Sequence, residues 1–155
     1  MSYSTDLAGE PSKHGGGSDT AHFHSPFKVF KQNVKFSDLG SGASDSIALA
    51  GFPADAVIVD QRLEIVTAFA GEADLAVSGG DTADADGRFT SFNLNAVAAG
   101  WGAITAGAEA ASPAHEADWA TAGADLTFTA TELDDVTAGE LNYYVYYWLP
   151  ALSTD

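Results

Sequence analysis

The stretch AVIVDQRLEIVTAF, residues 56–69, is the longest β-like run of the chain. Successive side chains of a strand point to opposite faces of its sheet, so a period of two sorts this stretch into two sets. The first set would be Val57, Val59, Leu63, Ile65, Thr67 and Phe69, and the second Ile58, Asp60, Arg62, Glu64 and Val66. The first set is almost wholly apolar and the second is mixed. We therefore predict a strand of an antiparallel sheet with one buried and one wetted face.

Shorter runs of similar character lie on both sides of this stretch. They cover residues 28–36, 47–50, 74–78, 88–94, 126–131 and 141–149. Turns rich in Gly, Asp and Pro separate them, and residues 79–87 contain too much Asp and Gly for any regular element. Because no helical period extends over ten residues, we predict an all-β fold. Its expected form is a single antiparallel β-sandwich or jelly-roll-like domain.

Two of the predicted strands suggest positions in the sheet. Lysines at 28, 31 and 35 suit an edge strand, where charge discourages unwanted pairing with other chains. Residues 141–149 are apolar or aromatic on both faces, which is typical of a central strand or of one covered by another chain. The aromatic residues that we expect either in the core or in self-association are Tyr144, Tyr146 and Trp148.

Residues 96–124 are rich in alanine, which favours helix, but glycines and a proline interrupt them. We interpret this segment as a loop with at most one short helical turn. Trp101 and Trp119 are its expected anchors, because large aromatic side chains bury most of the area in such thin segments.

Residues 1–27 are expected to form an extended arm, and residues 28–155 the sandwich domain. The arm contains three consecutive glycines and almost no apolar residue before Phe23. Its first residues lack the basic start and apolar run of a signal peptide, and no apolar stretch approaches the ~20 residues of a membrane helix. We expect a soluble chain that is made in a cytoplasm and has no membrane partner.

Charge divides the sequence into two unlike parts. The whole chain has 22 acidic and 6 basic residues, which gives a net charge of −16. Residues 1–36 hold all four lysines and carry +1, whereas everything after Phe36 carries −17. A body with this much negative charge repels phosphate backbones. We therefore expect no nucleic-acid partner. The acidity suits solubility, a salty habitat or a basic protein surface.

The motifs of catalysis and metal binding are weak or missing. The pair His22-x-His24 has no third ligand nearby, and the absence of cysteine removes thiolate sites. Half of a calcium loop is suggested by Asp81, Asp84 and Asp86, but the EF-hand spacing fails, and an Asp-Gly turn explains these residues better. No G-x-S-x-G elbow, P-loop or G-x-G-x-x-G occurs. We therefore expect neither an enzyme nor a cofactor.

Three segments together resemble a known class of proteins. They are VIVDQRLEIVTAF at 57–69, the Gly/Asp loop that ends in DADGRF at 79–89, and TAGELNYYVYY at 137–147. Their pattern is similar to that of small β-rich virion proteins of tailed bacteriophages, especially capsid decoration or cement proteins. The resemblance covers most of the body but neither the arm nor residues 96–124. It implies a protein that binds the outside of an assembled capsid as a homotrimer and braces it against internal DNA pressure.

On this hypothesis the arm and the strand after it bind the major capsid protein or a neighbouring subunit by adding a strand. The residues expected to make these contacts are His22, Phe23, His24, Phe27, Lys28, Phe30, Lys31 and Lys35. Two alternatives stay open. One is a tail or fibre module whose Trp101, Trp119 and tyrosines bind a host-surface glycan, and the other is an acidic secreted hydrolase that depends on His115.

Overall fold

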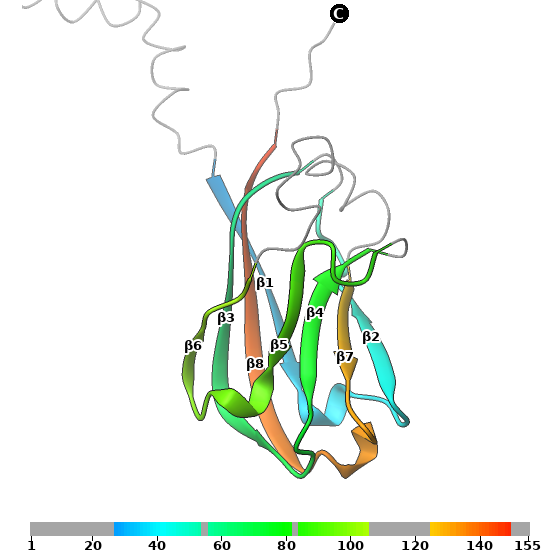
Figure 1. Cartoon of the computed structure of the whole chain (residues 1–155). Helices are drawn as coiled ribbons and strands as arrows, with labels where there is room; N and C mark the ends of the chain where they lie inside the picture. The colour runs from blue at the N-terminus through cyan, green and yellow to red at the C-terminus, as the bar shows by residue number, and fades with distance from the viewer. Residues whose placement is uncertain (1–26, 54–55, 82–83, 106–124, 150–155) are drawn as a thin grey trace, which may run out of the picture.

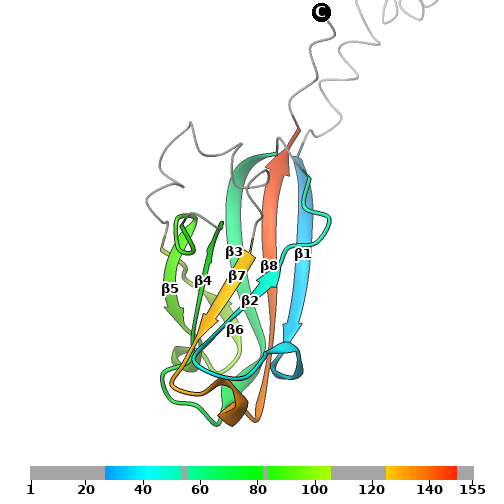
Figure 2. The same ribbon diagram turned by 90° about the vertical axis from the view of Figure 1, so that its right-hand side faces the viewer.

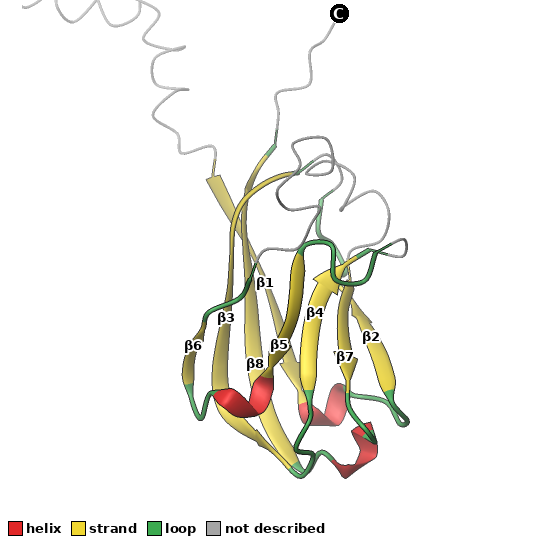
Figure 3. Ribbon diagram, viewed as in Figure 1, coloured by secondary structure: helices red, strands yellow, loops and turns green. Residues whose placement is uncertain are grey.

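The computed structural model describes residues 27–53, 56–81, 84–105 and 125–149, which form two β-sheets stacked face to face (Figures 1 and 2). The strands are β1 (Phe27–Lys35), β2 (Ser44–Ala48), β3 (Val57–Ala70), β4 (Ala76–Gly80), β5 (Phe89–Asn93), β6 (Gly100–Gly102), β7 (Asp125–Thr129) and β8 (Ala138–Trp148). Short 3-10 turns η1 (Phe36–Asp38), η2 (Leu94–Ala96) and η4 (Leu133–Asp135) lie together at one end of the sandwich (Figure 3). No helix in the described part of the chain is long and apolar enough to cross a membrane.

The order of the strands identifies the fold. Sheet A has the order β1-β8-β3-β6, and sheet B has the order β2-β7-β4-β5. Every pair is antiparallel, and the first strand pairs with the last, the second with the seventh, the third with the sixth and the fourth with the fifth. This nested pairing is the topology of a jelly roll. The predicted all-β, antiparallel, jelly-roll-like sandwich is therefore confirmed.

The positions predicted for two strands are also confirmed. The lysine-bearing β1 lies at an edge of sheet A, and β8 lies between β1 and β3. One face of β8 packs into the core through Leu141, Tyr143 and Val145, and the other carries the half-buried Tyr144, Tyr146 and Trp148. Phe27, which we assigned to the arm, is the first residue of β1 and pairs with Trp148.

A β-bulge makes the predicted division of β3 into two faces wrong at Val59. The pairing with β8 passes from Ile58 directly to Asp60, so Val59 is an extra residue and the alternation shifts there. As a result Ile58 packs against the core and Val59 is 53% exposed. A second irregularity, between Ile65 and Thr67, leaves Thr67 exposed as well. Period two holds only between such irregularities.

The core lies between the two sheets. Its fully buried large side chains are Leu63, Ile65, Leu75, Phe89, Leu94, Leu126, Phe128, Leu133, Leu141 and Tyr143. Towards the end of the sandwich where β1 begins, the ring of Phe52 contacts both Phe30 and Tyr147 edge-on, with centroids 5.3 Å apart in each pair. Aromatic rings prefer such edge contacts, which add to the stability gained from burial alone.

One cation and one phenol are buried among these apolar side chains. Arg88 is completely buried, close to Tyr143, whose hydroxyl donates a hydrogen bond to Gln61 Oε1. Burial raises the pKa of Tyr143 well above 10.0, because a phenolate there would lose its hydration. The backbone N–H of Arg88 donates to the Gly79 carbonyl, which ties the start of β5 to β4. Only two Lys or Arg residues follow Phe36, and one of them, Arg88, is buried in the core.

Two predicted loop boundaries need correction. Gly79 and Gly80, predicted as loop, belong to β4, because their lack of side chains leaves room for the ring of Phe89 and for the backbone of Asp84 and Ala85. Within the segment predicted as loop, Gly100–Gly102 pairs with β3 as β6. The remaining part of that segment, 106–124 with Trp119, lies outside the described residues.

Candidate functional site

The side of sheet A that faces away from sheet B carries the largest group of exposed aromatic and apolar side chains among the described residues. We call it the outer face of sheet A. It consists of Phe27, Val29, Lys31 and Asn33 on β1, Asn142, Tyr144, Tyr146 and Trp148 on β8, Val59, Asp60, Arg62, Glu64 and Val66 on β3, and Trp101 on β6. Outer faces of sandwich sheets are usually polar, so this composition indicates a binding surface.

A ladder of aromatic and basic side chains crosses the centre of this face. Tyr144 lies opposite Lys31 on one neighbouring strand and opposite Arg62 on the other. The Lys31 ammonium lies 5.4 Å from the centre of the Tyr144 ring, and the Trp101 ring centre lies 5.6 Å from the same point. The Arg62 guanidinium lies 5.7 Å from the Tyr146 ring centre. These distances permit cation–π attraction, which orients the exposed rings and cations.

A hydrogen-bonded network adjoins this ladder. Glu64 Oε2 accepts hydrogen bonds from Asn142 Nδ2 at 2.9 Å and from the Tyr144 hydroxyl at 2.8 Å. Asn33 Nδ2 donates to Glu140 Oε1 and to Asn142 Oδ1, both at 2.9 Å. The hydrogen bonds from Asn142 and Tyr144, helped by the nearby charge of Lys31, lower the pKa of Glu64. The network therefore fixes the Tyr144 ring in one orientation.

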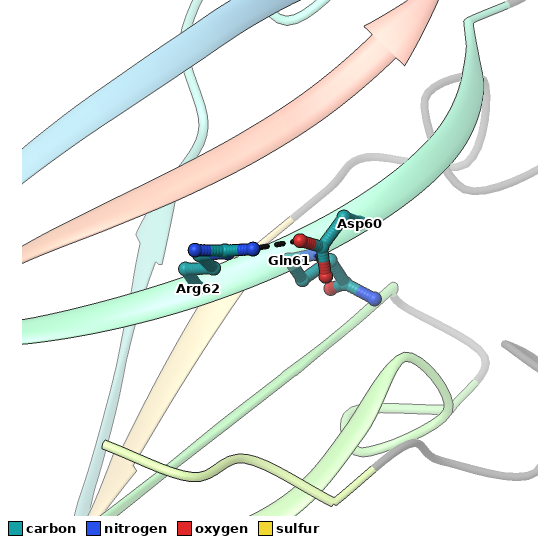
Figure 4. Close-up of polar contacts among 3 residues, drawn as sticks. All are labelled: Asp60, Gln61 and Arg62. Atoms are coloured by element: carbon teal, nitrogen blue, oxygen red, sulfur yellow. Dashed lines mark hydrogen bonds and ion pairs between the residues drawn. The ribbon is translucent and has the colours of Figure 1, made fainter. Parts of the chain in front are cut away.

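An ion pair separates two shallow hollows on the same face. Arg62 Nε donates to Asp60 Oδ2 at 2.9 Å, and Asp60 Oδ1 accepts from the backbone N–H of Gln61 (Figure 4). This contact raises the pKa of Arg62, mainly through the hydrogen bond to Asp60. One hollow, of about 310 Å³, lies between residues 60–62 of β3 and residues 101–104. The other, of about 320 Å³, is lined by Phe27, Val59, Asp60, Arg62 and Tyr146.

The second hollow lies at the end of sheet A where the described chain begins and ends. Phe27 pairs with Trp148 there, and Phe27 and Val29 are 55% and 54% exposed. Together with Val59 they form an apolar patch beside the points where residues 1–26 and 150–155 are attached. Apolar side chains that are exposed together are typical of protein–protein contact.

The structure places the predicted partner-binding residues in three settings. Phe27, Lys28, Lys31 and Lys35 are exposed on β1. Phe30 is half-buried against Phe52 on the core side of the strand. His22, Phe23 and His24 lie outside the described residues, as does His115. The predicted aromatic residues of β8, Tyr144, Tyr146 and Trp148, lie together on the outer face of sheet A.

On this face the prediction for Trp101 was wrong, and the role of Arg62 was missed although its exposed position was predicted. Trp101 is 58% exposed, so the expectation that it anchors a loop by burial is wrong. It lies opposite Glu64, on the outward side of β6. Arg62 was assigned to the mixed face of its strand without any role. The signal for Trp101 in the sequence is its position in Gly100-Trp101-Gly102, where a lone large side chain has no apolar neighbour in the chain.

The aspartate-rich loop forms turns within its described residues. Asp81 Oδ1 accepts from the Asp84 N–H at 2.9 Å, and the Asp84 carbonyl accepts from the Asp81 N–H. The Asp84 carboxylate raises the pKa of Asp86. Over the described residues, which omit 82–83, no three His, Cys, Asp or Glu side chains are arranged to hold a metal ion. The Asp86 N–H also donates to Asp84 Oδ1 at 3.4 Å, which is the spacing of an Asx turn.

Comparisons with known proteins give one match. Neither a protein-family model nor a curated protein sequence matches the chain. A solved chain described as "Cyanophage Pam1 capsid asymmetric unit" is similar in structure, with a TM-score of 0.52 and 16% sequence identity. The similarity covers 80% of this chain and 85% of that chain. At this identity it establishes a shared fold.

Proposed function

We propose that this protein is a phage virion structural protein that binds the outer surface of an assembled capsid and stabilises it. The observation that carries the proposal is the shared fold with a chain of the cyanophage capsid asymmetric unit, over 80% of the present chain. Jelly rolls also recur in viral capsid domains, which supports the proposal by analogy of fold. In this role the protein acts by binding and catalyses no reaction. Its partner is the major capsid protein, and its place is the exterior of the virion.

The proposed docking element is the arm together with the outer edge of β1. From Phe27 to Lys35, one edge of β1 is fully paired with β8, and no other described strand pairs with its opposite edge. A strand of a capsid subunit added at that edge would gain backbone hydrogen bonds. Residues 22–26 lead directly into β1, so His22, Phe23 and His24 would contact the same subunit.

Self-association is proposed to use the apolar end of the outer face of sheet A. Phe27, Val29 and Val59 are exposed there, beside a hollow of about 320 Å³ that Asp60, Arg62 and Tyr146 also line. Burying these side chains against a neighbouring subunit would remove apolar surface from water, at about 25 cal/mol for each Å². A homotrimer would present three arms to one capsid lattice, and such linked sites bind far more tightly than one arm alone.

Deletion of residues 1–26 tests the docking mechanism. Particles assembled without this protein are mixed with the full chain or the deletion variant, then pelleted and imaged by negative stain. We expect the full chain to pellet with the particles and to decorate them, and the variant to stay in solution. Circular dichroism should show the same β-sheet spectrum for both, because β1 begins at Phe27. A variant without residues 150–155, which are attached at the same end of sheet A, is the matched control and should still bind.

Two results would contradict the proposal at different levels. Equal binding by the full chain and the variant without residues 1–26 would exclude the arm as the docking element. No binding by the full chain would exclude capsid decoration itself. Sedimentation equilibrium of the full chain checks the assembly, and the mass of a single chain would exclude the homotrimer.

A further inference from the structure

The hollow beside Trp101 is separate from the proposed capsid-docking edge, although its Asp60 and Arg62 also line the hollow proposed for self-association. It lies where β6 separates from β3: Gly102 still pairs with Leu63, but residues 103–104 turn away from residues 61–62. The chain then reaches sheet B, where Thr105 O accepts from the Thr90 N–H. The hollow is therefore a fork between two strands, and its volume of about 310 Å³ is at the lower end of the range for small-ligand sites.

An aromatic platform forms one side of this fork. Trp101 is 58% exposed, the largest exposed fraction among the large apolar side chains in the described residues. Its indole is supported from the side by the Tyr144 ring, at an interplanar angle of 46°. Tyr144 is in turn fixed by its hydrogen bond to Glu64. The indole is thus held in place at an exposed position, as a stacking site requires.

Hydrogen-bonding groups of both kinds form the other side. Asp60 is an acceptor, and each of its oxygens retains a lone pair beyond the bonds to Gln61 N–H and Arg62 Nε. Asp60 engages only Nε of Arg62, so the two terminal amino groups of the guanidinium remain donors at the surface. The ion pair holds the two side chains in a fixed relative position.

We propose that this hollow binds a neutral saccharide. A sugar ring has an apolar C–H face, which stacks on Trp101, and hydroxyls that each donate and accept hydrogen bonds, which Asp60 and Arg62 satisfy together. A purely apolar ligand would cover the remaining lone pairs of Asp60 and the terminal amino groups of Arg62 without satisfying them. Because Asp60 already pairs with Arg62, the hollow offers no uncompensated positive charge to an anionic polysaccharide or a nucleic acid, and the net charge of −16 adds a general repulsion.

The position of the hollow is compatible with attachment to a capsid. Sheet A begins with β1 at one edge and ends with β6 at the other. A protein that docks by β1 keeps β6 and Trp101 away from the lattice. The site could then bind the saccharides of a cell surface, but its affinity for sugar does not depend on capsid binding.

A glycan array tests the proposal with the full chain. The array carries neutral hexose and N-acetylhexosamine oligosaccharides beside acidic ones that contain uronic or sialic acid. We expect binding to neutral glycans, and calorimetry on the best soluble one should give roughly tenfold weaker binding for Trp101→Ala. Arg62→Met should also weaken binding by roughly tenfold, because it keeps the apolar stem of the side chain but loses the donors.

The matched control is Val66→Ala, which removes an exposed apolar side chain of the same strand outside the hollow. It should bind the glycan as the unaltered chain does. Thermal melts verify that all three variants are folded, which we expect because the three side chains are exposed. Three outcomes would overturn the proposal. The unaltered chain could bind neutral glycans no more tightly than the Trp101→Ala variant does, or it could bind acidic glycans alone. The third outcome is a Trp101→Ala variant whose sedimentation mass changes while its sugar binding does not.

Discussion

At the scale of single residues, Glu64 connects the polar and aromatic parts of the outer face of sheet A. It accepts hydrogen bonds from two residues of β8, Asn142 and Tyr144, and lies opposite Trp101 on β6. Since both hydrogen bonds favour the charged carboxylate, the pKa of Glu64 is lowered from its ordinary value of 4.5. The folded state therefore holds this carboxylate in its charged form more strongly than the unfolded chain does.

This pKa shift predicts a specific dependence of stability on pH. The stabilisation by Glu64 is complete above pH 4.5, the ordinary value, and is lost as the pH falls through the lower pKa of the folded state. Glu64→Gln removes the titrating group but keeps an acceptor oxygen. As the pH is lowered from 6 to below 4.5, we expect the free energy of unfolding to fall less for this variant than for the unaltered chain. Urea unfolding at a series of pH values measures the difference.

The control for this prediction is Glu132→Gln, at an exposed glutamate whose side chain has no hydrogen bond to another described residue. It measures how much the pH dependence of the free energy of unfolding decreases when any one exposed carboxylate is removed. If Glu64→Gln and Glu132→Gln respond to acid in the same way, the network around Tyr144 does not stabilise the charged form of Glu64.

At the scale of elements, the end of the β3–β8 pair beyond Thr67 is irregular and relies on a glycine. The pairing shifts twice between Ile65 and Ala70, and Phe69 turns into the core there. Opposite this shift, Gly139 of β8 has a φ of +143°, and a Cβ atom at this position would lie 2.1 Å from the ring of Phe69. A side chain at 139 would therefore meet both backbone strain and a steric clash.

We predict that Gly139→Ala lowers the free energy of unfolding by about 3 kcal/mol, from strain and overpacking together. Gly42→Ala is the matched control: its φ is +88° and a Cβ atom there would have no neighbour within 4 Å. It should lose only about 1 kcal/mol from strain. Urea unfolding compares the two variants, and equal losses would mean that Phe69 moves aside without cost.

The same strands show how far the sequence predicts this fold. Edge lysines identify β1, and the two-sided apolar pattern identifies β8, because both depend on local composition. The bulge at Val59 was not predictable, because residues 57–59 are all apolar and the shift in alternation that an extra residue causes leaves no visible change in their pattern. The same holds for the candidate site. Tyr144 and Tyr146 were predicted from the pattern of one strand, but Arg62, Glu64 and Trp101 come beside them only through pairing with distant segments.

At the scale of the whole molecule, charge is distributed unevenly between the two sheets. Within the described residues, the strands of sheet A carry four basic and three acidic side chains. All the other described segments carry eleven acidic side chains and one basic residue, the buried Arg88. Sheet B and the loops therefore repel their counterparts on another copy, which favours contact through sheet A. The same charges also repel one another within one molecule.

This repulsion predicts that salt stabilises the protein. Raising NaCl from 0.01 M to 1 M shortens the screening length from about 30 Å to about 3 Å, which weakens repulsion among the acidic side chains. We expect the urea midpoint to rise with salt. Glu132→Gln combined with Asp135→Asn removes two charges from the net −16, so it should raise the midpoint at low salt and reduce the further gain from NaCl. The expected gain at low salt is about 0.5 kcal/mol.

The opposite change supplies the control. Lys28→Gln, at an exposed position of β1, makes the net charge more negative by one and should lower the midpoint at low salt. At 1 M NaCl all the proteins should differ little, because screening removes the difference among them. A midpoint that falls with salt would contradict the prediction, and would mean that attractive pairs such as Arg62–Asp60 outweigh the repulsion. Equal salt responses in all the variants would instead show that the gain comes from ion binding rather than from net charge.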